Sequence, residues 1–582
     1  MQLLTASIIH IIFMKKLASL SITTNLFLLL TINSLAQLSI NTFSEAIRIN
    51  QIGYYPQTVK SFVVVNCPEN SFEIKDQQNK TVFSGKLSEK GTWDKSGENI
   101  KNGDFSSLTK TGVYKIEIKN FGVSAPFTIS DNLYKTVLTA STKAFYYQRA
   151  STAISYLNGG EFARPAGHPD DTCYFHPSSG YNTGHINSAK GWYDAGDYNK
   201  YIVNGGVATN LLLSAVEVYP HFFNDGLLNI PESGNKINDL LDEIKWELDW
   251  FLTMQDYDGG VFFKLTNLSF DGFMLPHLTV EKRFVVGKST SSALNFVAVT
   301  AQAARVFKNT DREYALKCLN AAKNAWEWAK INNNIEFKNP GDVKTGEYGS
   351  SDFKQDFYWA AVNLYITTNE KQYLDYITQN LHNHKFIVGG NWNSFLGYLA
   401  SFSLVTVKNN SPETLKNLIK SQILQSADSL LIILEKNPYL QPLNEFVWGS
   451  NSDITSMALI FAHAYLLNSN KKYLNAAIQT TDYIFGKNAT GYCFVTGFGS
   501  KQVKNVHHRL SHNNIVNKAI PGFLAGGPNF SKQDAQQVTY LNPNYPAKSY
   551  EDVMDSYASN EIAINWNAPL VLLLCILESN SK

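Results

Sequence analysis

The sequence has few cysteines, no excess of one charge and no long apolar run beyond its N-terminus. Its 5 cysteines are scattered and odd in number, which argues against a disulfide framework. With 50 basic and 49 acidic residues the formal net charge is +1, so no field of one sign is present to hold nucleic acid or an anionic membrane. No later stretch approaches the ~20 apolar residues of a transmembrane helix. We expect no nucleic-acid partner, no membrane span and a monomeric protein.

Aromatic residues are abundant instead. They make up 13% of the chain, with 10 Trp and 30 Tyr. Flat aromatic side chains can stack on the apolar C–H faces of sugar rings, and they also fill large cores. Composition alone favours the core.

The N-terminus has the pattern of an export signal. Met14-Lys15-Lys16 supplies the positive charge, residues 26–30 an apolar run, and Ser34-Leu35-Ala36 a small-residue cleavage site. We predict that residues 1–36 are a cleaved signal peptide, with Met14 as a candidate initiator. The protein would then be secreted or periplasmic. An uncleaved anchor helix is the alternative.

Residues 40–130 have the pattern of short strands. Apolar residues at 114, 116 and 118 alternate with charged residues at 115, 117 and 119, which gives one dry and one wet face. The segments 95–99 and 101–104 are rich in turn-forming residues. We predict an immunoglobulin-like β-sandwich over 40–130.

Apolar spacings of three and four residues begin after residue 133 and predict helices. Twelve helices in residues 133–578 suit six helical hairpins in a ring, an all-α (α/α)6 barrel. The long irregular stretches 158–203 and 487–559 are the candidates for a functional cleft. The predicted helices are 134–150, 204–219, 237–255, 290–308, 312–330, 353–368, 370–380, 392–407, 411–436, 452–468, 470–486 and 560–578.

The segment Gly191-Trp192-Tyr193-Asp194-Ala195-Gly196-Asp197 carries two carboxylates three residues apart. Two such groups can share a water, one acting as a base while the other holds the second hydrogen. A turn with a solvated Asp pair, or a calcium loop, explains the spacing as well.

A second acidic centre lies near the C-terminus. Glu561 precedes an apolar helical run and has Tyr557 and Trp566 nearby, so we place it at a helix start. Apolar surroundings raise the pKa of a carboxylic acid, as a proton donor requires, whereas a helix N-terminus favours the anion. A helix-capping carboxylate is the alternative.

A Gly-rich loop at 497–499 leads to His507-His508-Arg509. These side chains could hydrogen-bond several sugar hydroxyls. A structural His pair or a weak metal site is the alternative.

Taken together, these segments resemble glycoside hydrolase family 9, cellulases on an (α/α)6 barrel, in one branch of which an immunoglobulin-like domain comes first. The resemblance implies an inverting endo-β-1,4-glucanase with Asp197 as general base, Asp194 positioning the water and Glu561 as general acid. It also implies Asp552 as a supporting carboxylate, and sugar binding by His507 and Arg509, with which we group His508. No cofactor would be needed for the chemistry.

Relatives with this N-terminal domain hold a structural zinc with two Cys and two His. The resemblance places the two His at His168 and His185, but the two Cys positions are Ala150 and Gly167, so a closed tetrahedral site is lost. Cys173 could compensate; we nevertheless predict no zinc.

Other candidate sites are oxygen-rich clusters and aromatic side chains. Calcium candidates are Glu232, Asn235 and Asp239, and Ser351, Asp352 and Asp356, although solvated helix caps explain both clusters. Candidate stacking residues are Trp192, Trp359, Trp448 and Tyr557, with core packing as the alternative for each Trp.

The expected function is hydrolysis of β-1,4-glucan in an open cleft. An exo-acting glycosidase on cello-oligosaccharides, or a non-catalytic glycan-binding protein on the same barrel, are the alternatives.

Overall fold

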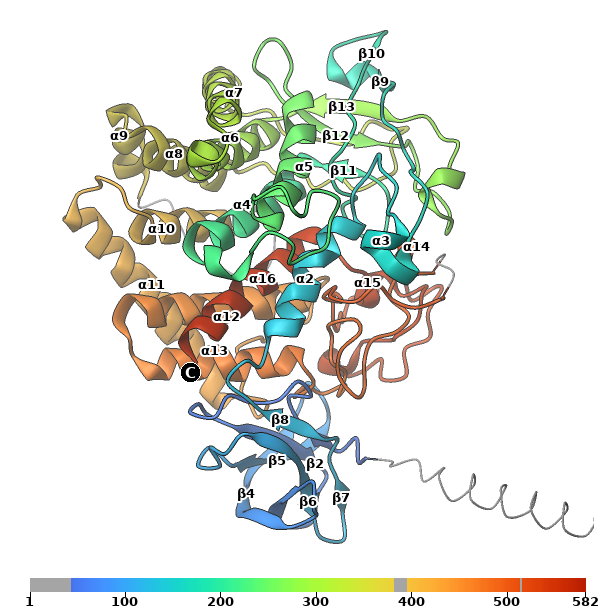
Figure 1. Cartoon of the computed structure of the whole chain (residues 1–582), viewed down its shortest axis with the longest axis vertical. Helices are drawn as coiled ribbons and strands as arrows, with labels where there is room; N and C mark the ends of the chain where they lie inside the picture. Colours follow the sequence, from blue (N-terminus) through green and yellow to red (C-terminus); the bar gives the residue numbers. More distant parts are fainter. Residues whose placement is uncertain (1–42, 382–394, 513–515, 582) are drawn as a thin grey trace, which may run out of the picture. The chain divides into compact units, whose positions relative to one another are not determined.

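The structure is a computed structural model that describes residues 43–381, 395–512 and 516–581 (Figure 1). The predicted signal peptide 1–36 and the first three residues of the predicted helix 392–407 lie outside these residues. Residues Glu45–Lys582 form one compact unit. Within the described residues, no helix is long and apolar enough to cross a membrane.

Strands come first along the chain and pair in the order β1-β2-β5-β4-β3-β6-β7, with β8 on β6. The alternation predicted at 114–118 is confirmed, because Tyr114, Ile116 and Ile118 are buried while the residues between them are half-buried. The bounds are β1 (Ile47–Arg48), β2 (Ser61–Val65), β3 (Ser71–Asp76), β4 (Thr81–Trp93), β5 (Glu98–Asp104), β6 (Gly112–Ile118), β7 (Gly122–Val123) and β8 (Phe127–Ile129).

The long strand β4 joins two halves of this sheet. Its first part pairs with β3 and its second part with β5. Aromatic rings connect the halves, for example Phe62 of β2 and Phe72 of β3 with centroids 4.8 Å apart. The turns expected at 95–99 and 101–104 were wrong in part, because β5 pairs with both β2 and β4. Its Gly103 lies so close to the Phe62 ring that a Cβ would come within 2.1 Å of it.

From Lys135 onward the chain is mainly helical. The predicted helices match the long helices, with ends that differ by up to four residues. The bounds are α2 (Lys135–Tyr147), α3 (Tyr156–Gly159), α4 (Ile202–Val218), α5 (Asp239–Thr253), α6 (Thr290–Val306), α7 (Arg312–Ile331), α8 (Lys354–Thr368), α9 (Lys371–Asn380), α10 (Leu396–Thr406), α11 (Glu413–Lys436), α12 (Ser450–Asn468), α13 (Lys471–Ile484), α14 (Arg509–His512), α15 (Tyr557–Asn560) and α16 (Ile564–Asn580).

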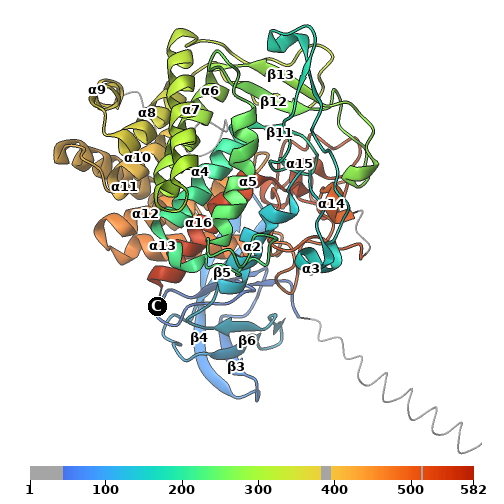
Figure 2. The same ribbon diagram turned by 45° about the horizontal axis from the view of Figure 1, so that its top comes forward.

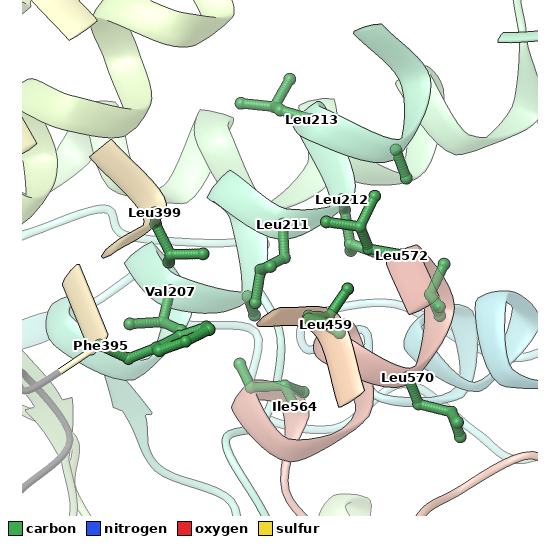
Figure 3. Packing of buried hydrophobic residues seen from close by; sticks show 14 of the residues in the cluster. Val207, Leu211, Leu212, Leu213, Phe395, Leu399, Leu459, Ile564, Leu570 and Leu572 are labelled. Atoms are coloured by element: carbon green, nitrogen blue, oxygen red, sulfur yellow. The ribbon is translucent and has the colours of Figure 1, made fainter. Parts of the chain in front are cut away.

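The most buried helices pack against one another in succession. Contacts link α4 to α6, α6 to α8 and α8 to α10, while α12 contacts α16 and α16 contacts α4 (Figure 2). Each has a second helix beside it, such as α7 on α6 and α13 on α12. Leucines of α4, α10, α12 and α16 meet in the core between them (Figure 3).

A second sheet, which the sequence did not reveal, has the order β10-β9-β13-β12-β11. Part of it lies in the stretch 158–203 that we read as irregular, because strands of two or three residues are too short to show an alternating pattern. Strand β11 leads directly into α4. The bounds are β9 (Cys173–Phe175), β10 (His185–Ile186), β11 (Lys200–Tyr201), β12 (Phe262–Thr266) and β13 (Phe284–Lys288).

Buried polar groups join the N-terminal strand region to the helices. The Asn50 amide donates to the Asp482 carboxylate of α13 at 2.8 Å, and the Tyr55 hydroxyl donates to Glu578 of α16 at 2.7 Å. Lys487 pairs with the same Asp482 at 3.2 Å. Because buried charges are costly unless they are paired, these contacts fix the two regions to each other.

Candidate active site

A cavity of about 810 Å³ lies at the N-terminal ends of α4, α12 and α16. Six residues that the sequence analysis singled out line it together, although they come from distant parts of the chain: Asp197, Trp448, His507, Arg509, Tyr557 and Glu561. The cavity is the place in the described structure where these groups meet.

The loop before β11 presents the acidic pair. The Asp194 N–H donates to the Asn199 carbonyl at 3.0 Å and closes the loop. The Asp194 carbonyl accepts the N–H of Ile564, the first residue of α16, at 2.9 Å. The loop is therefore tied to the segment that carries Glu561.

Gly196 allows three chain segments to approach closely. A Cβ at this position would lie 2.2 Å from the His507 carbonyl oxygen. The Gly196 carbonyl accepts hydrogen bonds from the Arg509 N–H and guanidinium, at 3.1 and 2.7 Å, and its N–H opposes the rise in the pKa of Glu561. No other residue type leaves room for this packing.

Asp194 is fully buried. Its Oδ2 accepts hydrogen bonds from the Asn204 amide at 3.1 Å and the Tyr348 hydroxyl at 3.2 Å. Its Oδ1 accepts none from the part of the chain that the structure describes. Burial, and then the nearby charge of Asp197, raises the pKa of Asp194 well above its usual range.

Asp197 has more charge-stabilising neighbours. Burial raises its pKa, but the Arg509 guanidinium and hydrogen bonds from Asn199 oppose that rise. The Asn199 amide donates to Asp197 Oδ2. A carboxyl group in this setting is suited to stay ionised and accept a proton.

We had expected Glu561 at the start of a helix, but it lies between two helices. It is in extended backbone at the end of α15, and α16 begins only at Ile564. Its backbone bridges to His507, and its carbonyl accepts the Gly526 N–H at 2.8 Å. Burial raises the pKa of Glu561 well above its usual range, and the charges of Asp197 and Asp194 add to the effect. This environment favours the protonated form.

His507 and Arg509 face the cavity, whereas His508 does not. The Nδ1 atom of His507 lies 2.7 Å from the Met554 carbonyl oxygen, so we assign the proton to Nδ1. Burial lowers the pKa of His507 to about 4. His508 is buried and its ring contacts the Gln148 side chain at 3.0 Å. The expected sugar contact of His508 was wrong, because protein covers its ring.

Asp552 does not line the cavity. Its carboxylate accepts the N–H groups of Lys504 and Asn505, at 3.0 and 2.8 Å, and the Asn560 amide at 3.2 Å. These contacts hold the segments that lead to His507 and to Glu561.

Of the four predicted stacking residues, two lie on the cavity. The Trp448 side chain is 40% exposed and lies 5.6 Å from the Tyr557 ring. Trp192 and Trp359 are fully buried and lie outside the lining. Their expected stacking role was wrong, because packing covers both faces of each indole.

Several lining residues had no signal in the sequence analysis. Asn204 is one of several polar residues in the mainly apolar helix α4. Tyr348 lies in an irregular loop between α7 and α8. Tyr201 packs edge-on against Tyr348 with centroids 4.9 Å apart. Trp566 of α16 had been noted only as an apolar neighbour of Glu561.

The two histidines predicted from the family's zinc site differ in their surroundings. His168 contacts the Tyr193 and Thr279 hydroxyls at 2.9 and 2.8 Å, and His185 is exposed in β10. Among the described residues, no three His, Cys, Asp or Glu side chains are arranged to hold a metal ion. The absence of zinc stays a prediction.

The side chains of both candidate calcium clusters have partners in the protein. Glu232 pairs with the Arg149 guanidinium at 3.0 Å, and the Asn235 amide donates to Asp242 at 3.0 Å. Asp239 accepts backbone N–H groups at 2.9 and 2.6 Å. In the second cluster, Asp352 accepts the Lys354 N–H at 3.1 Å and Asp356 accepts the Asn295 amide at 2.9 Å. A structural calcium stays a prediction.

Comparison with known proteins gives the family. Residues 134–574 match glycosyl hydrolase family 9, and residues 42–123 match the cellulase N-terminal ig-like domain. The chain is 38% identical to the xyloglucan-specific endo-beta-1,4-glucanase BoGH9A of Bacteroides ovatus, over 92% of this chain and 94% of that protein. It is 33% identical to endoglucanase D of Acetivibrio thermocellus, over 91% and 83%. The solved structure of Bacteroides ovatus GH9 matches with a TM-score of 0.85 and 37% identity, over 92% of this chain and 100% of that one. The chain therefore belongs to glycosyl hydrolase family 9 and is a glycoside hydrolase with an immunoglobulin-like N-terminal domain.

Proposed function

We propose that the protein is an exported endo-β-1,4-glucanase that inverts the anomeric carbon, on a barrel of six helical hairpins. The observation that carries the proposal is the meeting of Asp197 and Glu561 in one cavity, where Gly196 packs against His507 and the His507 backbone bridges to Glu561. Relatives named endoglucanases support the endo mode of action. The predicted N-terminal signal motivates export.

Asp197 is the general base and Glu561 the general acid. The Arg509 guanidinium favours the ionised form of Asp197, whereas burial and two neighbouring carboxylates favour the protonated form of Glu561. Environments that push two carboxyl pKa values apart are what acid–base hydrolysis of a glycoside needs. Inversion further requires the two groups to stand ~6.5–9.5 Å apart around the attacking water.

Asp194 orients that water. Asn204 and Tyr348 fix its Oδ2, which leaves Oδ1, a buried acceptor without a donor among the described residues, to receive a water hydrogen. The second hydrogen then faces Asp197, the base.

The substrate is a β-1,4-glucan that lies along Trp448 and Tyr557. The exposed Trp448 ring and the half-buried Tyr557 ring suit the apolar faces of sugar units. Neutral His507 and cationic Arg509 line the same cavity and complete a set of hydrogen-bonding groups for hydroxyls. Since one relative is named as xyloglucan-specific, xyloglucan belongs in the first substrate panel.

Substitution Glu561→Gln tests the acid. It keeps the size of the side chain but removes the proton donor, so kcat should fall by about 10²–10⁴-fold while glucan binding persists. Glu313→Gln, an exposed position in α7, is the matched control. Unchanged turnover in Glu561→Gln would falsify the assignment.

Two measurements on the unmodified protein test the rest. NMR of the first product should show the α-anomer; a β-anomer would refute inversion. Rapid viscosity loss of a soluble β-glucan marks endo action, whereas release of monomer alone would mark an exo-acting glycosidase. Binding of glucan without turnover would identify a glycan-binding protein instead.

A further inference from the structure

The wall of the cavity on helix α12 carries a carboxylate that the proposed chemistry does not use. Asp453 lines the cavity beside Ser452 and Ser456. It lies in the first turn of α12, which begins at Ser450, directly after the exposed Trp448. Val207 of α4 and Phe395 before α10 are apolar residues that line the same cavity (Figure 3).

Asp453 has no hydrogen-bond or ion-pair partner among the described side chains. Within residues 43–381, 395–512 and 516–581, no hydrogen bond or ion pair reaches its carboxylate. Its side chain is half-buried, and the surface that remains is on the cavity. Burial alone raises its pKa to about 7.

Asp453 comes from a different element than the proposed acid and base. It lies on α12, whereas Asp197 precedes β11 and Glu561 follows α15. The pKa shift of Asp453 has no contribution from Asp197 or Glu561. It is a hydrogen-bond acceptor on the α12 wall of the same cavity.

A desolvated carboxylate without a hydrogen-bond donor destabilises the free protein, so the stability of the fold does not explain why an Asp stands at this position. A first-turn acid does favour the dipole of α12, but an exposed position would provide that benefit without the cost of burial. Sugar hydroxyls are the donors that this cavity would bring. Two neighbouring hydroxyls of one ring can donate to the two oxygens of a carboxylate.

We propose that Asp453 is a substrate-binding residue that accepts hydrogen bonds from hydroxyls of a glucose unit of the β-glucan at the α12 wall of the cavity. Val207 and Phe395 line the same cavity and add apolar surface to it, and hydrogen bonds are stronger where water is excluded. The inference rests on the proposed function, because it takes the ligand to be a β-glucan.

The test is binding of cellobiose through cellohexaose to the Glu561→Gln protein, with and without Asp453→Ala. Loss of a charged hydrogen bond should weaken binding by about 10- to 100-fold once the oligosaccharide is long enough to reach the subsite. Glu413→Ala removes an exposed first-turn acid from α11 and is the matched control. It should leave affinity unchanged.

Asp453→Asn guards against misfolding, because it keeps the size of the side chain; thermal unfolding checks both variants. In the active protein, KM should rise with kcat nearly constant. Affinities of both variants within twofold of the parent at every chain length would overturn the inference. That result would leave the proposed function intact, whereas an unmodified protein that does not hydrolyse any β-glucan would refute the function itself.

Discussion

Gly196→Ala is the sharpest test of how the site is assembled. The added Cβ would lie 2.2 Å from the His507 carbonyl oxygen, and Cβ contacts under 3.0 Å are essentially never seen. The loop of Asp197 and the segment of His507 must therefore separate by at least about 0.8 Å. Because the clashing oxygen belongs to the His507 backbone, no side-chain rotation can relieve the clash.

That displacement should reduce kcat strongly. A shift of about 1 Å between reacting groups can cost roughly 10²-fold in rate, and here it also displaces His507, whose backbone bridges to Glu561. Hydrolysis of a soluble β-glucan measures the effect, and thermal unfolding shows whether the fold persists. Gly341→Ala, where a Cβ would meet no atom within 4 Å, is the control. A folded Gly196→Ala protein with kcat close to that of the unmodified protein would refute this account of the site.

Three further predictions follow from the contacts of the site and its surroundings. The rate should rise with pH as Asp197 ionises. It should fall again as Glu561 loses its proton, at a pKa above the usual range of a glutamate. A kcat profile that already falls near pH 4.5 would contradict this assignment. Arg149→Met leaves Glu243 buried without its 3.0 Å partner, so the free energy of unfolding should fall by roughly 3–5 kcal/mol in denaturant titration, and a loss under 1 kcal/mol would be inconsistent with it. Trp448→Ala should raise KM about tenfold with less effect on kcat if stacking contributes ~1–1.5 kcal/mol, and an unchanged KM would exclude stacking there.

The long helices could be predicted because their apolar residues recur every three to four positions, a local property of the chain. The short strands β9–β11 could not, since two or three residues carry no period, and β9 and β11 also pair with strands far along the sequence. Strand β5 was read in part as turns because it contains Asn99, Asn102 and Gly103, residue types that are common in turns.

At the site, the residue types and their order predicted which carboxyl groups meet, but not how they are held. Tyr348 and Asn204 reach Asp194 through folding alone. The burial of each aromatic side chain was equally hidden: Trp192 and Trp448 were both predicted to stack on sugar rings, yet Trp192 is buried and Trp448 is exposed. Burial depends on which helices pack together, and a linear pattern does not contain that information.

The junction of the N-terminal strands with α13 and α16 has a consequence for the integrity of the whole enzyme. Removing that region would take away the Asn50 and Tyr55 side chains, which donate hydrogen bonds to Asp482 and Glu578. Glu578 lies in the last turns of the helix whose first residue donates its N–H to the Asp194 carbonyl. The immunoglobulin-like domain therefore contributes contacts to a helix that also supports the catalytic loop, and we expect a chain shortened before Lys135 to be less stable at α16.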